Sequence, residues 1–119
     1  MEHTHTKTDL PIEKQYPKLV RDKIPAIIER DGKVAETHIA GQEEYISHLL
    51  SKLIEEATEL KKAEGSNHQK EEMADVQEVL KSLRAVLNFS EVELTEVQAS
   101  KFEERGGFEG RIILDSLPE

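Results

Sequence analysis

Residues 53–87 decide the fold of this chain and read LIEEATELKKAEGSNHQKEEMADVQEVLKSLRAVL. The stretch holds two pairs of acids, each with a spacing of three residues: Glu56 with Glu59, and Glu72 with Asp75. At about 100° per residue, this spacing places both members of a pair on adjoining parts of one helix face. A break at Gly65 separates the pairs. Two helices folded back on each other at this break would bring four carboxylates together.

The second half of the stretch has the spacing of a buried helical stripe, formed by Met73, Val76, Val79, Leu80, Leu83, Val86 and Leu87. On a helical wheel Glu72 falls inside this stripe, and Asp75 lies at its edge. A buried, unpaired carboxylate is costly, so Glu72 needs a compensating cation. No Lys or Arg lies between Met73 and Leu80 to supply one locally. The pattern therefore predicts a bound divalent metal, Mg²⁺ or alternatively Mn²⁺, because such cations prefer oxygen ligands.

A second amphipathic pattern precedes the break, formed by Ile46, Leu49, Leu50, Leu53, Ile54, Ala57 and Leu60. The two patterns predict an all-α fold whose longest helices span residues 42–64 and 69–88. Ser66 and Gln69 match a capping box at the start of the second helix, which implies a tight connection and an antiparallel pair.

Two further helices are expected. Pro25 suits the start of a short helix that Gly32 ends. Ser90 and Glu93 match a capping box for a helix over residues 91–105, which ends at a Gly-Gly pair. After it, the apolar residues 111–115 predict a short extended segment that packs on the bundle or on a partner subunit.

Basic residues lie near the predicted helices. Lys18, Arg21 and Lys23 cluster before the first helix, where they could clamp phosphates or simply be solvated, and both interpretations stay open. Lys52 lies on the flank shared by Glu56 and Glu59, where a salt bridge is favoured over a phosphate contact. Glu55 projects to the opposite side and is interpreted as solvated. The last helix places two cations in line with its apolar residues, Lys101 and Arg105.

Composition limits the organisation of the chain. Its 119 residues fit one domain, expected over residues 16–119 after a flexible tail at 1–15, and 36% hydrophobic residues allow only a modest core. Oligomerisation, most simply a homodimer, is therefore expected.

Charge and cysteine content narrow the function classes. A net charge of −9 argues against binding of nucleic acid or an anionic membrane by the chain as a whole. The absence of cysteine excludes disulfides and thiolate metal sites. No apolar run approaches the roughly 18 residues of a membrane span, and the polar start does not match a signal peptide. These features predict a cytoplasmic protein.

The acidic spacing resembles the signature of the all-α nucleoside triphosphate pyrophosphohydrolases, the superfamily that includes MazG, dimeric dUTPases and phosphoribosyl-ATP pyrophosphohydrolase. Twelve residues separate Glu59 from Glu72, and Glu55 completes the Glu-Glu-x-x-Glu form of MazG-like members. Residues 101–105, KFEER, resemble a Lys-Phe-x-x-Arg stretch of MazG. Residues 18–25, KLVRDKIP, are similar to the opening of a small MazG-like group often labelled phosphoribosyl-ATP pyrophosphohydrolase-like.

The resemblance covers about residues 16–114. It implies an antiparallel helical bundle of the MazG-like type, an oligomer that builds the site, and Mg²⁺-dependent hydrolysis between the α- and β-phosphates. The products would be a nucleoside monophosphate and pyrophosphate, in a house-cleaning role on non-canonical nucleotides. The Gly-Gly pair at 106–107 and the short tail differ from longer MazG proteins, so the choice of substrate is not carried over.

The resemblance also implies roles for individual residues. The metal would be held by four carboxylates, Glu56, Glu59, Glu72 and Asp75, and Glu56 would double as general base. Phosphate oxygens would pair with Lys101 and Arg105, with Lys52, Arg21 and Lys23 in reserve. Two alternatives remain: phosphoribosyl-ATP hydrolysis in histidine biosynthesis, and a non-catalytic helical interaction module whose acids are only solvated. Metal titration separates the module from the enzymes.

Overall fold

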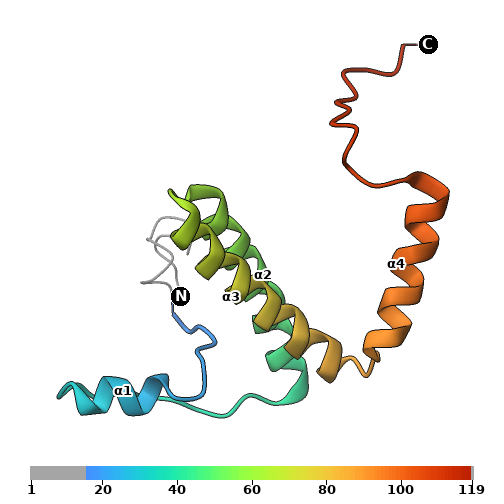
Figure 1. Ribbon diagram of the computed structural model, residues 1–119. Coiled ribbons are helices and arrows are strands. Elements are labelled where there is room, and N and C mark those ends of the chain that lie inside the picture. The colour runs from blue at the N-terminus through green and yellow to red at the C-terminus, as the bar shows by residue number, and fades with distance from the viewer. Residues whose placement is uncertain (1–15, 119) are drawn as a thin grey trace. The chain divides into compact units, whose positions relative to one another are not determined.

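The computed structural model describes residues 16–118 and contains, within them, four α-helices and no β-strand (Figure 1). The helices are α1 (Ile24–Arg30), α2 (Gln42–Lys62), α3 (Ser66–Val86) and α4 (Glu91–Arg105). The all-α class is therefore confirmed, and residues 106–118 carry no helix or strand, as expected for the C-terminal segment. The flexible tail predicted at 1–15 lies outside the described residues.

The chain divides into two compact units, the first ending at Leu87 and the second beginning at Asn88. Each is described by itself, so the single domain expected over residues 16–119 stays a prediction. No helix of the described part is long and apolar enough to cross a membrane.

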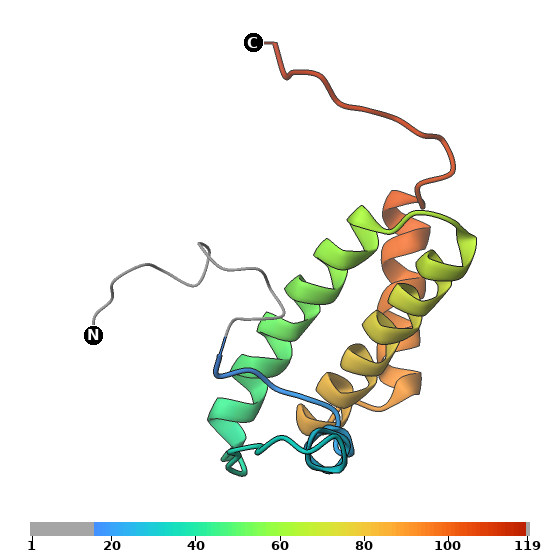
Figure 2. The same cartoon turned by 90° about the vertical axis from the view of Figure 1, so that its left-hand side faces the viewer.

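The first unit is built on α2 and α3, which lie side by side in both views (Figures 1 and 2). Its buried apolar residues are few: Leu49 from α2, and Val79 and Leu83 from α3. Four partly buried residues pack against them, namely Leu19, Tyr45, Leu53 and Val86. The core is modest, as the composition predicted, and one helix pair supplies most of it.

The predicted apolar stripes are only partly buried, which corrects the interpretation of both as core. On α3, Met73 and Leu80 stay 55% and 48% exposed, and Leu87, which caps the end of this helix, is 42% exposed. On α2, Leu50 and Ile54 are also exposed. The stripes are wider than the surface that one neighbouring helix covers. Within the described residues, the side of each stripe turned away from the other helix therefore remains in solvent.

The connection between α2 and α3 is tight, but its capping differs from the prediction. The N-cap of α3 is Gly65, whose φ of 86° is readily available only to glycine, and its carbonyl accepts the N–H of Gln69 at 3.0 Å. Ser66 is already helical and makes no side-chain cap, so the capping box predicted for Ser66 and Gln69 is wrong. Because Gly65 makes the turn itself, α3 begins three residues before the predicted start.

The shorter elements of the first unit follow the sequence closely. Pro25 is the second residue of α1, and Gly32, with a φ of 86°, donates its N–H to the Glu29 carbonyl just after the helix ends. The irregular segment before α1 brings Leu19 onto the core of the α2–α3 pair.

The second unit confirms the predicted capping box. The Ser90 hydroxyl accepts the N–H of Glu93 at 3.0 Å, and the Glu93 carboxylate accepts the N–H of Ser90 at 2.7 Å. At the other end Gly106 has a φ of 81° and donates its N–H to the Phe102 carbonyl at 2.7 Å. No residue of α4 is buried, and the apolar residues of the following segment are also exposed. Their packing on the bundle or on a partner stays a prediction.

Candidate metal centre

Three of the four predicted metal-binding acids come together in the first unit. One carboxylate oxygen from each of Glu56, Glu72 and Asp75 lies within 4.8 Å of the other two. Glu56 comes from α2, whereas Glu72 and Asp75 come from adjacent turns of α3. Both acids of the α3 pair therefore meet Glu56 of α2, because the two helices are packed side by side. We refer to Glu56, Glu72 and Asp75 as the acidic cluster.

Glu72 is the most buried of these acids, at 8% exposure. It forms no hydrogen bond or ion pair within residues 16–118. Burial is the main cause that raises its pKa above the ordinary 4.5, followed by Asp75; His68 opposes the rise, and Glu59 and Glu71 add to it. A carboxylate in this position is costly to ionise, so a cation placed at the cluster would relieve a real energetic cost.

Glu56 is similarly placed on α2, with 12% of its side chain exposed. Burial raises its pKa above 4.5, and Lys52 is the largest opposing influence. Asp75, Glu72 and Glu55 raise it further through like-charge repulsion. Two of the three clustered acids are thus disfavoured as bare carboxylates.

Glu59, the fourth predicted ligand, is half-buried on α2. Its charge contributes to the raised pKa of Glu72, so it belongs to the same electrostatic environment. Its oxygens nevertheless do not join the group that lies within 4.8 Å. The same step of three residues keeps Asp75 with Glu72 on α3, so the spacing alone does not decide which acids meet. The role of Glu59 as a ligand stays a prediction.

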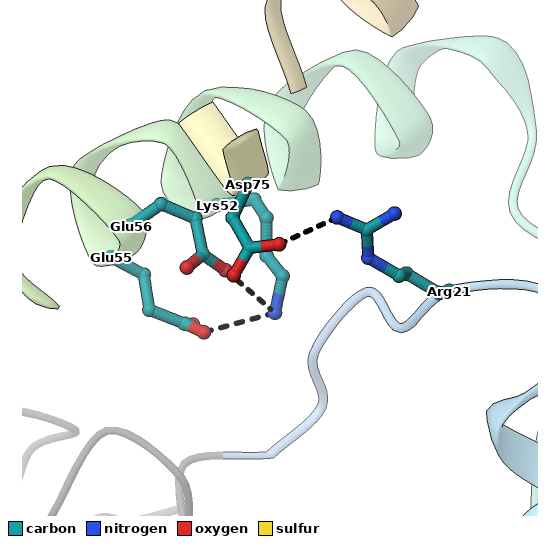
Figure 3. A network of polar contacts seen from close by, with 5 residues as sticks. All are labelled: Arg21, Lys52, Glu55, Glu56 and Asp75. Carbon is teal, nitrogen blue, oxygen red and sulfur yellow. Dashed lines mark hydrogen bonds and ion pairs between the residues drawn. The ribbon is translucent and has the colours of Figure 1, made fainter. Parts of the chain in front are cut away.

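Lys52 supplies a positive charge from α2. Its Nζ lies 2.9 Å from Glu55 Oε1 and 3.7 Å from Glu56 Oε2 (Figure 3). The salt bridge predicted for Lys52 with Glu56 is therefore confirmed. The interpretation of Glu55 as merely solvated is wrong: its side chain is 22% exposed and paired, since residues three apart also meet on a helix.

Arg21 supplies the other charge, from the irregular segment before α1. Its Nη2 donates to Asp75 Oδ1 at 2.6 Å, across 54 residues of sequence (Figure 3). Sequence reasoning named Arg21 only as part of a basic cluster and missed this partner. The available signal was Leu19, an apolar residue among the basic ones, which packs on the core and brings the segment to α3.

Three further residues were predicted as phosphate ligands, namely Lys23, Lys101 and Arg105. Lys23 is the exposed N-cap residue of α1. Lys101 and Arg105 belong to α4 in the second unit, where Arg105 Nε lies 3.5 Å from Glu104 Oε1 at the surface. Binding of phosphate by these three residues stays a prediction.

The acidic cluster fits a hard divalent cation. All three donors are carboxylate oxygens, the ligands that Mg²⁺ and Mn²⁺ prefer. The most buried of them, Glu72, has no ion-pair partner among the residues that the structure describes. Arg21 and Lys52 offset only part of the negative charge of Glu55 and the cluster. Comparisons with protein-family models, curated proteins and solved structures find no match to this chain, so its function has to be inferred from the residues of this site.

Proposed function

We propose that this chain is a metal-dependent nucleoside triphosphate pyrophosphohydrolase. It hydrolyses the bond between the α- and β-phosphates and releases a nucleoside monophosphate and pyrophosphate. The observation that carries the proposal is Glu72, a carboxylate buried in an apolar stripe. It forms no ion pair with any residue of 16–118, and its oxygen lies within 4.8 Å of oxygens from Glu56 and Asp75. A solvated acidic face, as in a non-catalytic module, does not require burial of a carboxylate.

The chain's residues suit the steps of this reaction. Glu56, Glu72 and Asp75 are placed to hold a divalent cation, with Glu59 as the nearby fourth acid. Such a cation would neutralise phosphate charge and lower the pKa of a bound water. We assign Glu56 the further role of general base, as the family resemblance implies. Lys101 and Arg105, with Lys52 and Lys23, are the proposed partners of the phosphate oxygens.

The fold proposed for the whole chain is an antiparallel helical bundle of the MazG-like type, assembled as a homodimer. Side chains that face away from the core of the α2–α3 pair remain exposed: Leu50, Ile54, Met73, Leu80 and Leu87. In an antiparallel pair these positions come from matching flanks of the two helices and share one face. We propose that a second copy covers this face, since two-fold pairing is the commonest solution. Light scattering that gave a monomer mass at micromolar concentration would contradict the dimer.

The test of the proposed activity uses the full chain. Calorimetric titration with Mg²⁺ and with Mn²⁺ should show stoichiometric binding, and the metal should raise the melting temperature by mass action. Pyrophosphate release should then be assayed on canonical, deoxy and damaged triphosphates and on phosphoribosyl-ATP. For any substitution of a cluster acid, Glu78→Gln is the matched control, because Glu78 is an exposed acid of α3 outside the cluster. Absence of both metal binding and pyrophosphate release in the parent protein would overturn the proposal.

A further inference from the structure

The contact between Arg21 and Asp75 joins a cation to the acidic cluster from outside the helix pair. Arg21 Nη2 lies 2.6 Å from Asp75 Oδ1, and Asp75 is one of the three cluster acids. The guanidinium thus neutralises the more exposed acid Asp75 (Figure 3). The more buried acid, Glu72, forms no ion pair within residues 16–118. Arg21 therefore supplies part of the positive charge that a metal ion at the acidic cluster would supply.

The contact is easily exchanged. The side chains of Arg21 and Asp75 are 58% and 36% exposed, and exposed ion pairs contribute little to stability. The backbone nearby is held independently, because Leu19 packs on the core two residues earlier and the Arg21 carbonyl accepts the N–H of Ile24 at 3.0 Å. The guanidinium can therefore change its partner without release of the segment that carries it.

A triphosphate that reaches the cluster presents the kind of partner that arginine binds best. Phosphate oxygens accept two parallel hydrogen bonds from a guanidinium, and such charge-assisted bonds are stronger than neutral ones. A phosphate bound at the cluster lies next to Asp75 and hence within reach of the Arg21 side chain. A divalent cation competes with Arg21 for Asp75, whereas the substrate offers Arg21 a replacement.

We propose that Arg21 exchanges partners at this site: it pairs with Asp75 while the acidic cluster holds no metal ion, and it pairs with a phosphate oxygen of the substrate once a divalent cation has bound the cluster. This inference rests on the proposed function. It makes Arg21 both a competitor of the metal and a ligand of the substrate. Arg21 therefore opposes binding of the metal alone and favours binding of the metal together with a polyphosphate.

The exchange predicts effects of opposite sign in one variant. In Arg21→Ala, Mg²⁺ alone should bind roughly three- to tenfold more tightly, because a nearby positive charge has been removed. With Mg²⁺ present, inorganic tripolyphosphate should bind roughly tenfold or more weakly, because a charge-assisted hydrogen bond to phosphate is lost. Arg21→Lys keeps the charge and loses the planar fork, so Mg²⁺ affinity should stay near that of the parent while tripolyphosphate binding is still weakened.

Calorimetry on the full-length parent and variants measures both affinities, and none of these measurements depends on turnover. Arg30→Ala is the control, since Arg30 is an exposed residue at the end of α1 that forms no ion pair within the described part of the chain, and it should change neither affinity. Weaker or unchanged Mg²⁺ binding in Arg21→Ala would overturn the exchange and make Arg21 a fixed partner that orients Asp75. If the parent protein binds no Mg²⁺, the proposed function fails together with the exchange. If the parent binds Mg²⁺ and Arg21→Ala does not bind it more tightly, only the exchange fails.

Discussion

Helices α3 and α4 have similar amphipathic sequences and different environments. Along α3, Val79 and Leu83 are buried against α2, and the carboxylate of Glu72 is buried in the same apolar stripe. Along α4, Val97 and Phe102 are 55% and 65% exposed and no residue is buried, although this helix has the better cap. Local sequence is enough to define a helix, whereas burial of an apolar stripe requires a second surface.

The difference separates two kinds of functional evidence. Glu72 of α3 is constrained by tertiary packing, and its low exposure, its raised pKa and its closeness to Glu56 and Asp75 mark a candidate site. The phosphate-binding role proposed for Lys101 and Arg105 of α4 rests on the sequence pattern alone. An isolated helix of 15 residues is only marginally stable in water, so α4 is expected to gain a covering surface in the working protein.

The largest expected effect is that of replacing Glu72, the acid within the apolar stripe of α3. Glu72→Ala should abolish Mg²⁺-dependent pyrophosphate release, because the cation loses a ligand. In EDTA the variant should melt at the same temperature as the parent or higher, since removal of a buried carboxylate relieves repulsion and desolvation. A variant that stays active and is destabilised would show instead that Glu72 is structural, paired with a charge left stranded by the substitution.

Matched truncations test the contrast in burial directly. Leu83→Ala in α3 should lower the free energy of unfolding by about 2–5 kcal/mol, as for buried leucines generally. Val97→Ala in α4 should cost less than about 0.5 kcal/mol if α4 stays as exposed as described. Urea denaturation of both variants at several protein concentrations gives the comparison. A cost for Val97→Ala that grows with protein concentration would show that a second copy covers α4.

A charge on the exposed stripe of α3 tests the proposed dimer. Leu80→Lys should shift the mass measured by light scattering from dimer to monomer, because a lysine would be desolvated in the interface. Lys81→Glu, at an exposed neighbouring position on another flank, is the control and should stay dimeric. A monomeric parent would remove the basis of this test and of the dimer.

The pH dependence of the metal-free protein reports on the buried acids. The pKa values of Glu56 and Glu72 are raised in the fold, mainly by burial, so the native state binds more protons than the unfolded state between the ordinary 4.5 and the raised values. The free energy of unfolding should therefore fall as pH rises through this window and stay low at neutral pH. Denaturation in EDTA at stepped pH should show a smaller fall for Glu72→Gln. An equal fall in both proteins would contradict the raised pKa of Glu72.

The smallest expected effect is local. Ser90→Ala removes the hydroxyl that accepts the Glu93 N–H and should cost α4 about 1 kcal/mol of helix stability. Because no residue of α4 is buried, amide hydrogen exchange should speed up within α4 and stay unchanged in α3. Faster exchange in both helices would show that the two units unfold together.

Much of the fold follows from local signals in the sequence. The four helices, the capping box of Ser90 and Glu93, and the end of α4 at Gly106 depend on residues within a turn of each other. The burial of Glu72 was also predictable, because its position on a helix wheel needs only the helical period. The start of α3 was mispredicted because Gly65 makes the turn through its backbone, which no side-chain motif announces.

The sequence by itself determined an all-α chain and an acid placed within an apolar stripe, because helical periodicity is a local property. Only the tertiary structure decided which acids meet, which half of each stripe is buried, and that Arg21 reaches Asp75 from 54 residues away. These outcomes depend on the distance and rotation between packed elements. Side chains on neighbouring helices therefore find their partners through packing that no local pattern encodes.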